Sequence, residues 1–161
     1  MMICPFHFGT YVEASNLLLC RPDLKSHVLD SVNMTTCREC VQEADLLGAD
    51  RFHDLTGLLS TNLRFDDIEN IVRNEIPLRD PVKPVKACYL VPNSLFYGLV
   101  RTYGSLIEGK GVDVFPSYDI NEIAGVLGVD VSVISKGDLP ADRKDSGLSR
   151  PAKNGENDNL P

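Results

Sequence analysis

The first thing that the sequence lacks is a surplus of basic residues. Its 23 Asp and Glu residues outnumber its 16 Lys and Arg residues, so the formal net charge is −7 at pH 7. A domain that binds duplex DNA through its phosphates usually carries a basic surplus. The phosphate backbone repels an acidic chain, and we therefore expect no nucleic-acid partner.

Long apolar runs are absent as well. The longest uninterrupted run, Ala87–Val91, is far shorter than the roughly 20 residues of a membrane-spanning helix. The first residues lack the basic region and the apolar core of a signal peptide. The most apolar expected helix offers only Arg101 and Lys110 as basic residues, too few for a helix on a membrane surface. We expect a cytoplasmic protein with no transmembrane segment and no association with membrane surfaces.

Catalytic signatures are also missing. The spacing of His7, His27 and His53 does not suggest a nucleophilic triad. The glycines between Gly104 and Gly111 do not form the phosphate-binding Gly-x-x-x-x-Gly-Lys-Ser/Thr motif. No pair of carboxylates stands out for acid–base chemistry. The sequence therefore favours a non-enzymatic protein that needs no cofactor.

What the sequence does contain is enough for one folded domain. Hydrophobic residues make up 43% and charged residues 24% of the 161 residues, as in ordinary globular proteins. Residues 136–161 contain no aromatic residue, Val, Ile or Met, and they carry as many basic as acidic residues. Such a segment cannot bury enough apolar surface to fold. We predict a domain over residues 1–135 that carries the whole net charge, and a disordered tail over residues 136–161.

Hydrophobic spacing predicts an alternation of strands and helices. Strands are expected over residues 9–14, 16–20, 51–55, 85–91, 112–115 and 129–134, with a tight turn at Ser15-Asn16. Helices are expected over residues 36–48, 65–76, 94–108 and 119–127. Residues 21–34 are expected to be irregular or to hold a short strand within 28–32. Two strands followed by helix–strand alternation predict an α/β fold with a mixed, largely parallel sheet and helices packed on it.

A distinctive pattern runs through the second half. An expected strand with a polar turn at its end covers Lys86–Ser94, and it leads into a helix with Tyr-Gly and Arg at Tyr97–Arg101. An expected strand at Val112–Phe115 and a short helix at Ile120–Leu127 follow. Matching upstream segments are Phe52–Leu58 and Leu63–Ile68. Over residues 9–128 the chain resembles the SpoIIAA-like family of the STAS superfamily, which includes anti-sigma-factor antagonists. The resemblance implies a STAS-type fold, a regulatory role and binding of an apolar molecule.

The candidate binding site lies where two predicted strands end. In a sheet of parallel strands, ligands collect at the carboxyl ends of the strands, beside helix N-termini. If these two strands are parallel neighbours, Thr56 and Ser94 lie on the same edge of the sheet. We predict that an apolar ligand or a protein partner binds there, and the candidate residues are Asp54, Thr56, Gly57, Asn93, Ser94, Phe96, Tyr97 and Arg101. Alternatively, Asn93 and Ser94 only cap the helix and Asp54 only closes a turn.

The helix expected over residues 94–108 has more apolar residues than a core helix needs. They are Leu95, Phe96, Leu99, Val100, Tyr103, Leu106 and Ile107. Most are expected to pack on the sheet, and the surplus either packs as well or lines a pocket for an apolar ligand.

The resemblance also implies a phosphorylation switch. Antagonists of the STAS superfamily are switched by a phosphate on a Ser or Thr after the equivalent strand, where the added negative charge repels an acidic partner. The hydroxyl residues in the matching stretch are Thr56, Ser60 and Thr61. None of them lies in the Asp-Ser pair typical of such switches.

The five cysteines supply an alternative function. Cys37 and Cys40 form a Cys-x-x-Cys pair at the start of a predicted helix, which suits thiol-redox chemistry. Together with Cys4 and His7 they make a zinc-binding set. In the competing interpretation Cys37 and Cys40 pack on the apolar stripe of that helix, with no metal bound. The sequence leaves homo-oligomerisation open.

Overall fold

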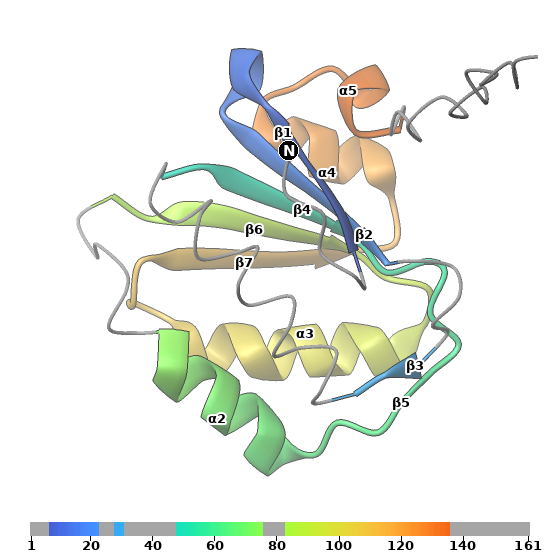
Figure 1. Ribbon diagram of the computed structural model, residues 1–161, viewed down its shortest axis with the longest axis vertical. Coiled ribbons are helices and arrows are strands. Elements are labelled where there is room, and N and C mark those ends of the chain that lie inside the picture. The colour runs from blue at the N-terminus through green and yellow to red at the C-terminus, as the bar shows by residue number, and fades with distance from the viewer. Residues whose placement is uncertain (1–6, 23–27, 31–47, 76–82, 136–161) are drawn as a thin grey trace, which may run out of the picture.

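The computed structural model describes residues 7–22, 28–30, 48–75 and 83–135. The main strands are β1 (His7–Val12), β2 (Leu17–Pro22), β4 (Asp50–Asp54), β6 (Val85–Leu90) and β7 (Val112–Ser117). They form one sheet in the order β1–β2–β4–β6–β7 (Figure 1). β1 is antiparallel to β2, and the other neighbours are parallel. The fold is therefore α/β with a mixed, largely parallel sheet, as the sequence predicts.

Helices and short elements complete the described chain. The helices are η1 (Glu13–Ser15), α2 (Phe65–Glu75), α3 (Ser94–Ile107), α4 (Ile120–Leu127) and α5 (Val131–Ser135). Two short strands, β3 (Val28–Leu29) and β5 (Ser60–Thr61), form a separate parallel pair. No helix in these parts of the chain is long and apolar enough to cross a membrane.

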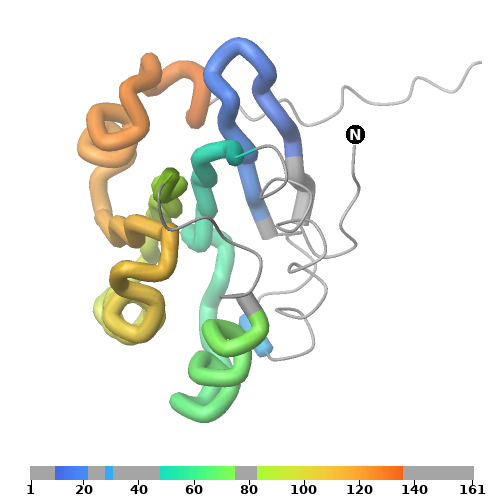
Figure 2. Tube along the Cα trace, turned by 90° about the vertical axis from the view of Figure 1, so that its left-hand side faces the viewer, coloured from blue at the N-terminus to red at the C-terminus, as the bar shows by residue number. Residues whose placement is uncertain are grey.

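The helices cover the two faces of the sheet. α3 lies against β7 on one face, and α2 packs against α3 (Figure 1). α4 contacts β6 and β7 on the opposite face, with α5 beside it. In the view of Figure 2, α4 (orange) lies in the upper part of the molecule and α2 (green) at its lower end. The sheet is thus the middle layer of three.

Strand β6 supplies side chains to both faces. Ala87 belongs to a cluster with Ile107 of α3, whereas Cys88 belongs to a cluster with Ile123 of α4. Both β6 residues are 0% exposed. A strand that is covered on both faces is apolar at nearly every position, and this is why the sequence predicts it so clearly.

The β1–β2 hairpin turns at Asn16, as predicted. Asn16 has a left-handed backbone with φ of 47°, a conformation that Asn tolerates better than most residues. Its N–H donates to the carbonyl oxygen of Glu13 at 3.1 Å. Its side chain accepts a hydrogen bond from the Tyr11 hydroxyl at 2.8 Å and donates to the Gly48 carbonyl at 3.1 Å. The side chain therefore ties the hairpin to the segment that leads into β4.

The strand predicted over residues 129–134 is wrong, because Val131–Ser135 forms α5. The Asp130 carboxylate accepts a hydrogen bond from the Ser132 N–H at 2.8 Å, which is the bond that starts a helix. Hydrogen bonds from Ser132 hold the pKa of Asp130 below its ordinary value. Val129, Val131 and Val133 all pack against the cluster beneath α4.

Several other sequence predictions concern residues that the structure does not describe. The helix predicted over residues 36–48 lies outside the described residues except for Gly48, and the tail over 136–161 lies wholly outside them. In the segment 21–34, the described residues Val28 and Leu29 form β3, in agreement with the short-strand alternative. The sequence does not predict β5, because a two-residue strand leaves no periodic pattern.

Two glycines of α3 offer a matched test of how closely this helix packs on β7. A Cβ added at Gly104 would lie 3.1 Å from the Cβ of Val114, whereas one added at Gly98 would meet no atom within 4 Å. We expect Gly98→Ala to stabilise the protein by about 0.5–1 kcal/mol, because alanine favours a helix. We expect Gly104→Ala to be less stable than Gly98→Ala by at least about 1 kcal/mol, because α3 must move away from β7. Urea unfolding of both variants measures the difference, and equal effects would contradict the close packing.

Candidate functional site

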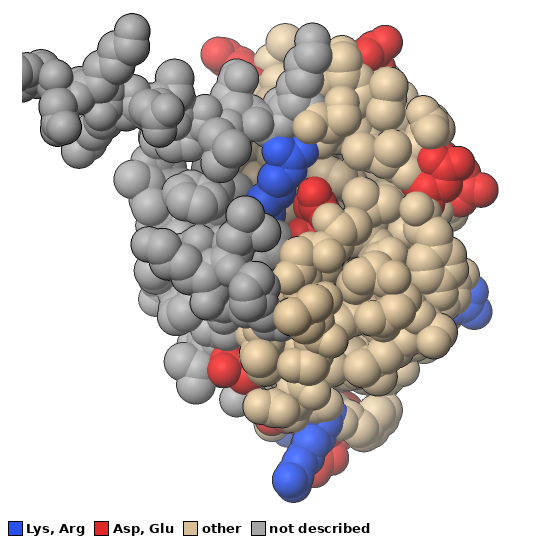
Figure 3. All heavy atoms as spheres, turned by 90° about the vertical axis from the view of Figure 1, so that its right-hand side faces the viewer, with Lys and Arg blue, Asp and Glu red and all other residues tan. Residues whose placement is uncertain are grey.

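The carboxyl ends of the parallel strands open on one edge of the sheet. The Leu55 N–H donates to the Leu90 carbonyl at 2.9 Å, and the Val91 N–H donates to the Ser117 carbonyl at 3.0 Å, so neighbouring strands end at the same level. Because β4 and β6 are parallel neighbours, Thr56 and Ser94 do lie on the same edge, as the sequence predicts. Figure 3 looks onto this side of the molecule, where most of the described surface is uncharged.

The loop after β4 is organised by Asp54. Its Oδ1 accepts hydrogen bonds from the Thr56 N–H at 3.0 Å and from the Thr56 hydroxyl at 2.6 Å. Its Oδ2 lies 3.6 Å from Nε of Arg21, at the end of the neighbouring strand β2. The Asp54 carboxylate thus closes the turn, while Thr56 is exposed and Gly57 partly buried behind it.

The loop after β6 is organised by Asn93, the N-cap of α3. Its Oδ1 accepts hydrogen bonds from the N–H groups of Leu95 at 3.1 Å and Phe96 at 3.2 Å. Two of the N–H groups in the first turn of α3 are therefore engaged by the cap. Ser94 is exposed. Phe96 is 0% exposed and belongs to the core, so in this structure its ring packs and does not reach the surface.

The loop after β7 presents Tyr118, which the sequence analysis does not identify. The Ser117 hydroxyl donates to Oε2 of Glu122 at 2.6 Å and accepts from the Asp119 N–H at 3.0 Å. These bonds fix the loop around Tyr118, which is 57% exposed. Its ring stacks on Tyr97 of α3, with centroids 5.3 Å apart and planes 10° from parallel.

Each of the three neighbouring strands β4, β6 and β7 is followed by an exposed, large apolar side chain. Leu59 is 74% exposed, Leu95 54% and Tyr118 57%. The loop that carries Leu59, the start of α3 with Leu95 and the loop that carries Tyr118 each follow a strand that ends on this edge. We call Leu59, Leu95, Tyr97 and Tyr118 the strand-end surface. The sequence carries no distinct signal for this set, because the loop after β4 also contains the buried residues Leu55 and Leu58, and Leu95 lies within α3.

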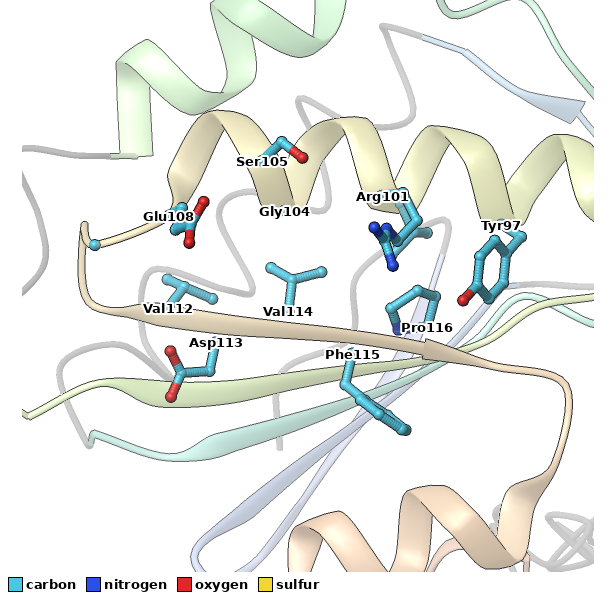
Figure 4. Close-up of a pocket in the computed structure, with 12 residues that line it drawn as sticks. Tyr97, Arg101, Gly104, Ser105, Glu108, Val112, Asp113, Val114, Phe115 and Pro116 are labelled. Atoms are coloured by element: carbon cyan, nitrogen blue, oxygen red, sulfur yellow. The ribbon is translucent and has the colours of Figure 1, made fainter.

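A groove of about 400 Å³ leads from this surface along α3 and β7 (Figure 4). Tyr97 and Arg101, both candidate residues from the sequence, line it on the helix side. They lie one helical turn apart and so share one flank of α3. Val112, Val114 and Pro116 line it on the strand side. The structure therefore brings Tyr97 and Arg101 together in this groove, whereas Asp54, Thr56 and Gly57 do not line it.

Most of the wide apolar face of α3 is core. Phe96, Val100 and Ile107 are buried, and Tyr103 packs edge-on against Tyr89 with ring centroids 6.3 Å apart. Leu95 is the exception, at 54% exposed. The packing interpretation therefore accounts for this face better than a pocket for an apolar ligand does.

The three hydroxyls proposed for a phosphorylation switch differ in their surroundings. The Thr61 hydroxyl donates to the Leu29 carbonyl at 2.8 Å and accepts from the Leu63 N–H at 3.1 Å, so it holds the β3–β5 pair together. Ser60 is exposed in β5, and Thr56 is exposed beside Asp54. Among the three, only Thr56 follows directly on a strand of the main sheet.

The alternative thiol or zinc function rests on residues that the structure does not place. Cys4, Cys37 and Cys40 lie outside the described residues, and His7 begins β1. Within the parts of the chain that are described, no group of three or more His, Cys, Asp or Glu residues is arranged to hold a metal ion. Burial, and secondarily the charge of Asp50, raise the pKa of the Cys88 thiol from 9.0 to about 12. A thiol with so high a pKa is a poor nucleophile.

Comparison of the chain with protein-family models, with curated proteins and with solved structures finds no match. The function is therefore argued from the site alone.

The cap of α3 provides a stability test. We expect Asn93→Ala to destabilise the protein by about 1 kcal/mol, because two backbone N–H groups lose their acceptor. Ser94→Ala is the matched control on the next, exposed residue, and we expect it to change the free energy of unfolding by less than about 0.5 kcal/mol. Urea unfolding measures both. An Asn93→Ala variant as stable as the wild type would show that the cap is dispensable.

The raised pKa of the Cys88 thiol predicts that the folded protein loses stability at alkaline pH. Its pKa is higher in the folded protein than in the unfolded chain, so the folded state keeps the proton at a pH at which the unfolded state loses it. The stabilisation is complete below about pH 9 and disappears as the pH rises toward about 12. We expect the free energy of unfolding to fall more between about pH 8 and about pH 10 in the wild type than in Cys88→Ala. Equal losses in the two proteins would assign the pH dependence to other groups.

Proposed function

We propose that this α/β domain is a non-enzymatic regulatory module that binds a protein partner through the strand-end surface. The observation that carries the proposal is the exposure of Leu59, Leu95 and Tyr118, one after each of three neighbouring parallel strands. Exposed apolar side chains that gather on one side of a soluble domain mark interaction sites. Tyr residues are favoured at protein interfaces, because each ring is large and rigid and carries a polar group.

The packing of α3 favours a protein partner over an enclosed apolar ligand. Phe96, Val100 and Ile107 of this helix are buried in the core. The groove beside the helix is lined by the charged side chains of Arg101 and Glu108. Small-molecule sites are usually concave and mostly apolar. A surface with exposed aromatic and aliphatic side chains is better suited to another protein.

The composition and the resemblance to SpoIIAA-like proteins support a regulatory role. With a net charge of −7, the domain attracts partners whose binding face is basic or apolar rather than acidic. Thr56 is exposed on the same edge as the strand-end surface. A phosphate there would add nearly two negative charges beside Asp54 and weaken the turn that Asp54 closes.

A photo-cross-linking amino acid at position 118 tests the proposal in cells that produce the protein. Tyr118→p-benzoylphenylalanine places the reactive group in the strand-end surface. Tyr11→p-benzoylphenylalanine is the matched control, because Tyr11 is also an exposed tyrosine (41%) but lies in the β1–β2 hairpin. We expect a discrete cross-linked protein adduct from position 118 and none from position 11.

Two outcomes would contradict this function. Equal adducts from positions 118 and 11 would indicate non-specific contact, and no adduct from either would indicate that the surface has no protein partner. Native mass spectrometry of the freshly purified protein gives an independent result. A bound molecule of lipid-like mass would show that the domain carries a small apolar ligand instead.

A further inference from the structure

The groove beside α3 follows the edge of β7 rather than one face of the sheet. Successive side chains of a strand point to opposite faces, yet all the consecutive residues 112–116 line the groove. Because these side chains point to both faces, the groove must lie along the backbone of the strand. The opposite wall is a single flank of α3, since residues 97, 101, 104 and 108 recur at helical spacing. The groove is therefore bounded by a helix flank and a strand edge, as Figure 4 shows.

The hydrogen bonds to β6 determine which backbone groups of β7 face the groove. The Val85 N–H donates to the Gly111 carbonyl and the Val91 N–H to the Ser117 carbonyl. In a parallel ladder, residues that bond to one neighbour alternate with residues whose N–H and C=O point the other way. The odd-numbered residues of 111–117 therefore face β6, and Val112, Val114 and Pro116 direct their backbone groups into the groove.

This edge is open in the part of the chain that the structure describes. β7 is the last strand of the sheet, and no hydrogen bond to the outward backbone groups of Val112 and Val114 occurs among the described residues. Pro116 has no N–H, and proline in strands is confined to edges for that reason. The edge thus presents the N–H groups of Val112 and Val114 and the carbonyls of all three outward residues.

We propose that this groove binds an extended segment of a partner protein, which adds to the sheet as a strand beside β7. Strand addition to an exposed sheet edge is a common way of binding peptides: the main chain supplies hydrogen bonds, and alternate side chains supply specificity. Here α3 forms the side wall and β7 the pairing strand. The groove shares only Tyr97 with the strand-end surface, and either proposal can fail without the other.

The charged residues of the groove indicate which charges the bound partner segment carries. Arg101 lies near the Pro116 end, and Glu108 and Asp113 lie at the Val112 end (Figure 4). A complementary segment carries an acidic residue at the Arg101 end and a basic residue at the Glu108 end. Between them, β-branched or aromatic residues suit a strand that lies against Val112 and Val114.

Other occupants fit this edge less well. Strands pair about 4.8 Å apart, whereas packed helices need about 8–10 Å between their axes. α3 lies directly against β7, with Gly104 on Val114. An antiparallel second copy joined at β7 would therefore bring its own α3 too close. Residues 136–161 of this chain contain no Val, Ile or aromatic residue, and they make a poor strand.

The test begins with a phage-displayed library of random peptides, selected on the full-length protein. We expect the enriched peptides to combine a basic residue at one end, an acidic residue at the other and β-forming residues between. Bound peptide should slow amide hydrogen exchange at Val112 and Val114 about tenfold or more, because these N–H groups gain acceptors. The double variant Arg101→Glu, Glu108→Arg should prefer peptides of reversed charge order.

N-methylation of the selected peptide, one position at a time, tests strand pairing without altering the protein. Methylation at positions whose N–H groups face β7 should weaken binding about tenfold or more, and methylation at the alternate positions should have little effect. The proposal is overturned if no peptide is enriched over a library selected without the protein, if bound peptide leaves exchange at Val112 and Val114 unchanged, or if the methylation effects do not alternate. Cross-linking at position 118 reports separately on the strand-end surface.

Discussion

Burial of β6 on both faces is the constraint on which the rest of the structure depends. Ala87 and Cys88 are both fully buried, one toward α3 and the other toward α4, and such small side chains let helices approach from both sides. Because β4 and β7 pair with β6 in parallel, their carboxyl ends open on a single edge. The loops that follow must run over that edge. The segments that carry Leu59, Leu95 and Tyr118 therefore all start from this edge.

The sequence predicts those helices and strands whose buried and exposed residues follow a regular pattern. β6 is covered on both faces and is apolar at every position except Lys86, and α3 carries a polar cap followed by apolar residues at helical spacing. Both lie where the sequence places them. The prediction fails at Val131–Ser135, where alternating valines suggest a strand. The local signal that decides for a helix is Asp130, whose carboxylate receives the Ser132 N–H. The apolar residues of this short helix, Val131, Val133 and Ile134, all pack in the cluster under α4, so periodicity alone does not distinguish the two structures.

The sequence predicts on which edge of the sheet the candidate site lies, but not which side chains are exposed there. Parallel strands and their order place Thr56 and Ser94 on one edge, and this is correct. Polar residues at strand ends, however, serve the backbone as readily as a ligand, and Asp54 and Asn93 are both engaged in local hydrogen bonds. Tyr118 is absent from the prediction because a single aromatic residue in a loop has no periodicity.

The open edge of β7 shows a further limit of sequence reasoning. Whether a strand is central or at an edge depends on which strands pair with it, and no local pattern records this. Pro116 is the one residue that points to the answer, because a strand with a proline cannot donate a full ladder of hydrogen bonds. Proline is also one of the means by which proteins protect open edges from self-association. In β7, Pro116 removes one N–H donor at the Arg101 end, whereas the N–H groups of Val112 and Val114 remain. The edge can therefore still pair with another strand, but with fewer hydrogen bonds.

Tyr97 joins the two surfaces that the fold creates. Its ring stacks on Tyr118 in the strand-end surface, and it lines the groove together with Arg101. A partner seated on the strand-end surface therefore has the mouth of the groove beside it. If the partner's own chain continues into the groove, the second contact becomes intramolecular and adds avidity without a larger hydrophobic patch. Such an arrangement would suit the regulatory role that we propose, because each contact can remain weak while the combination is specific.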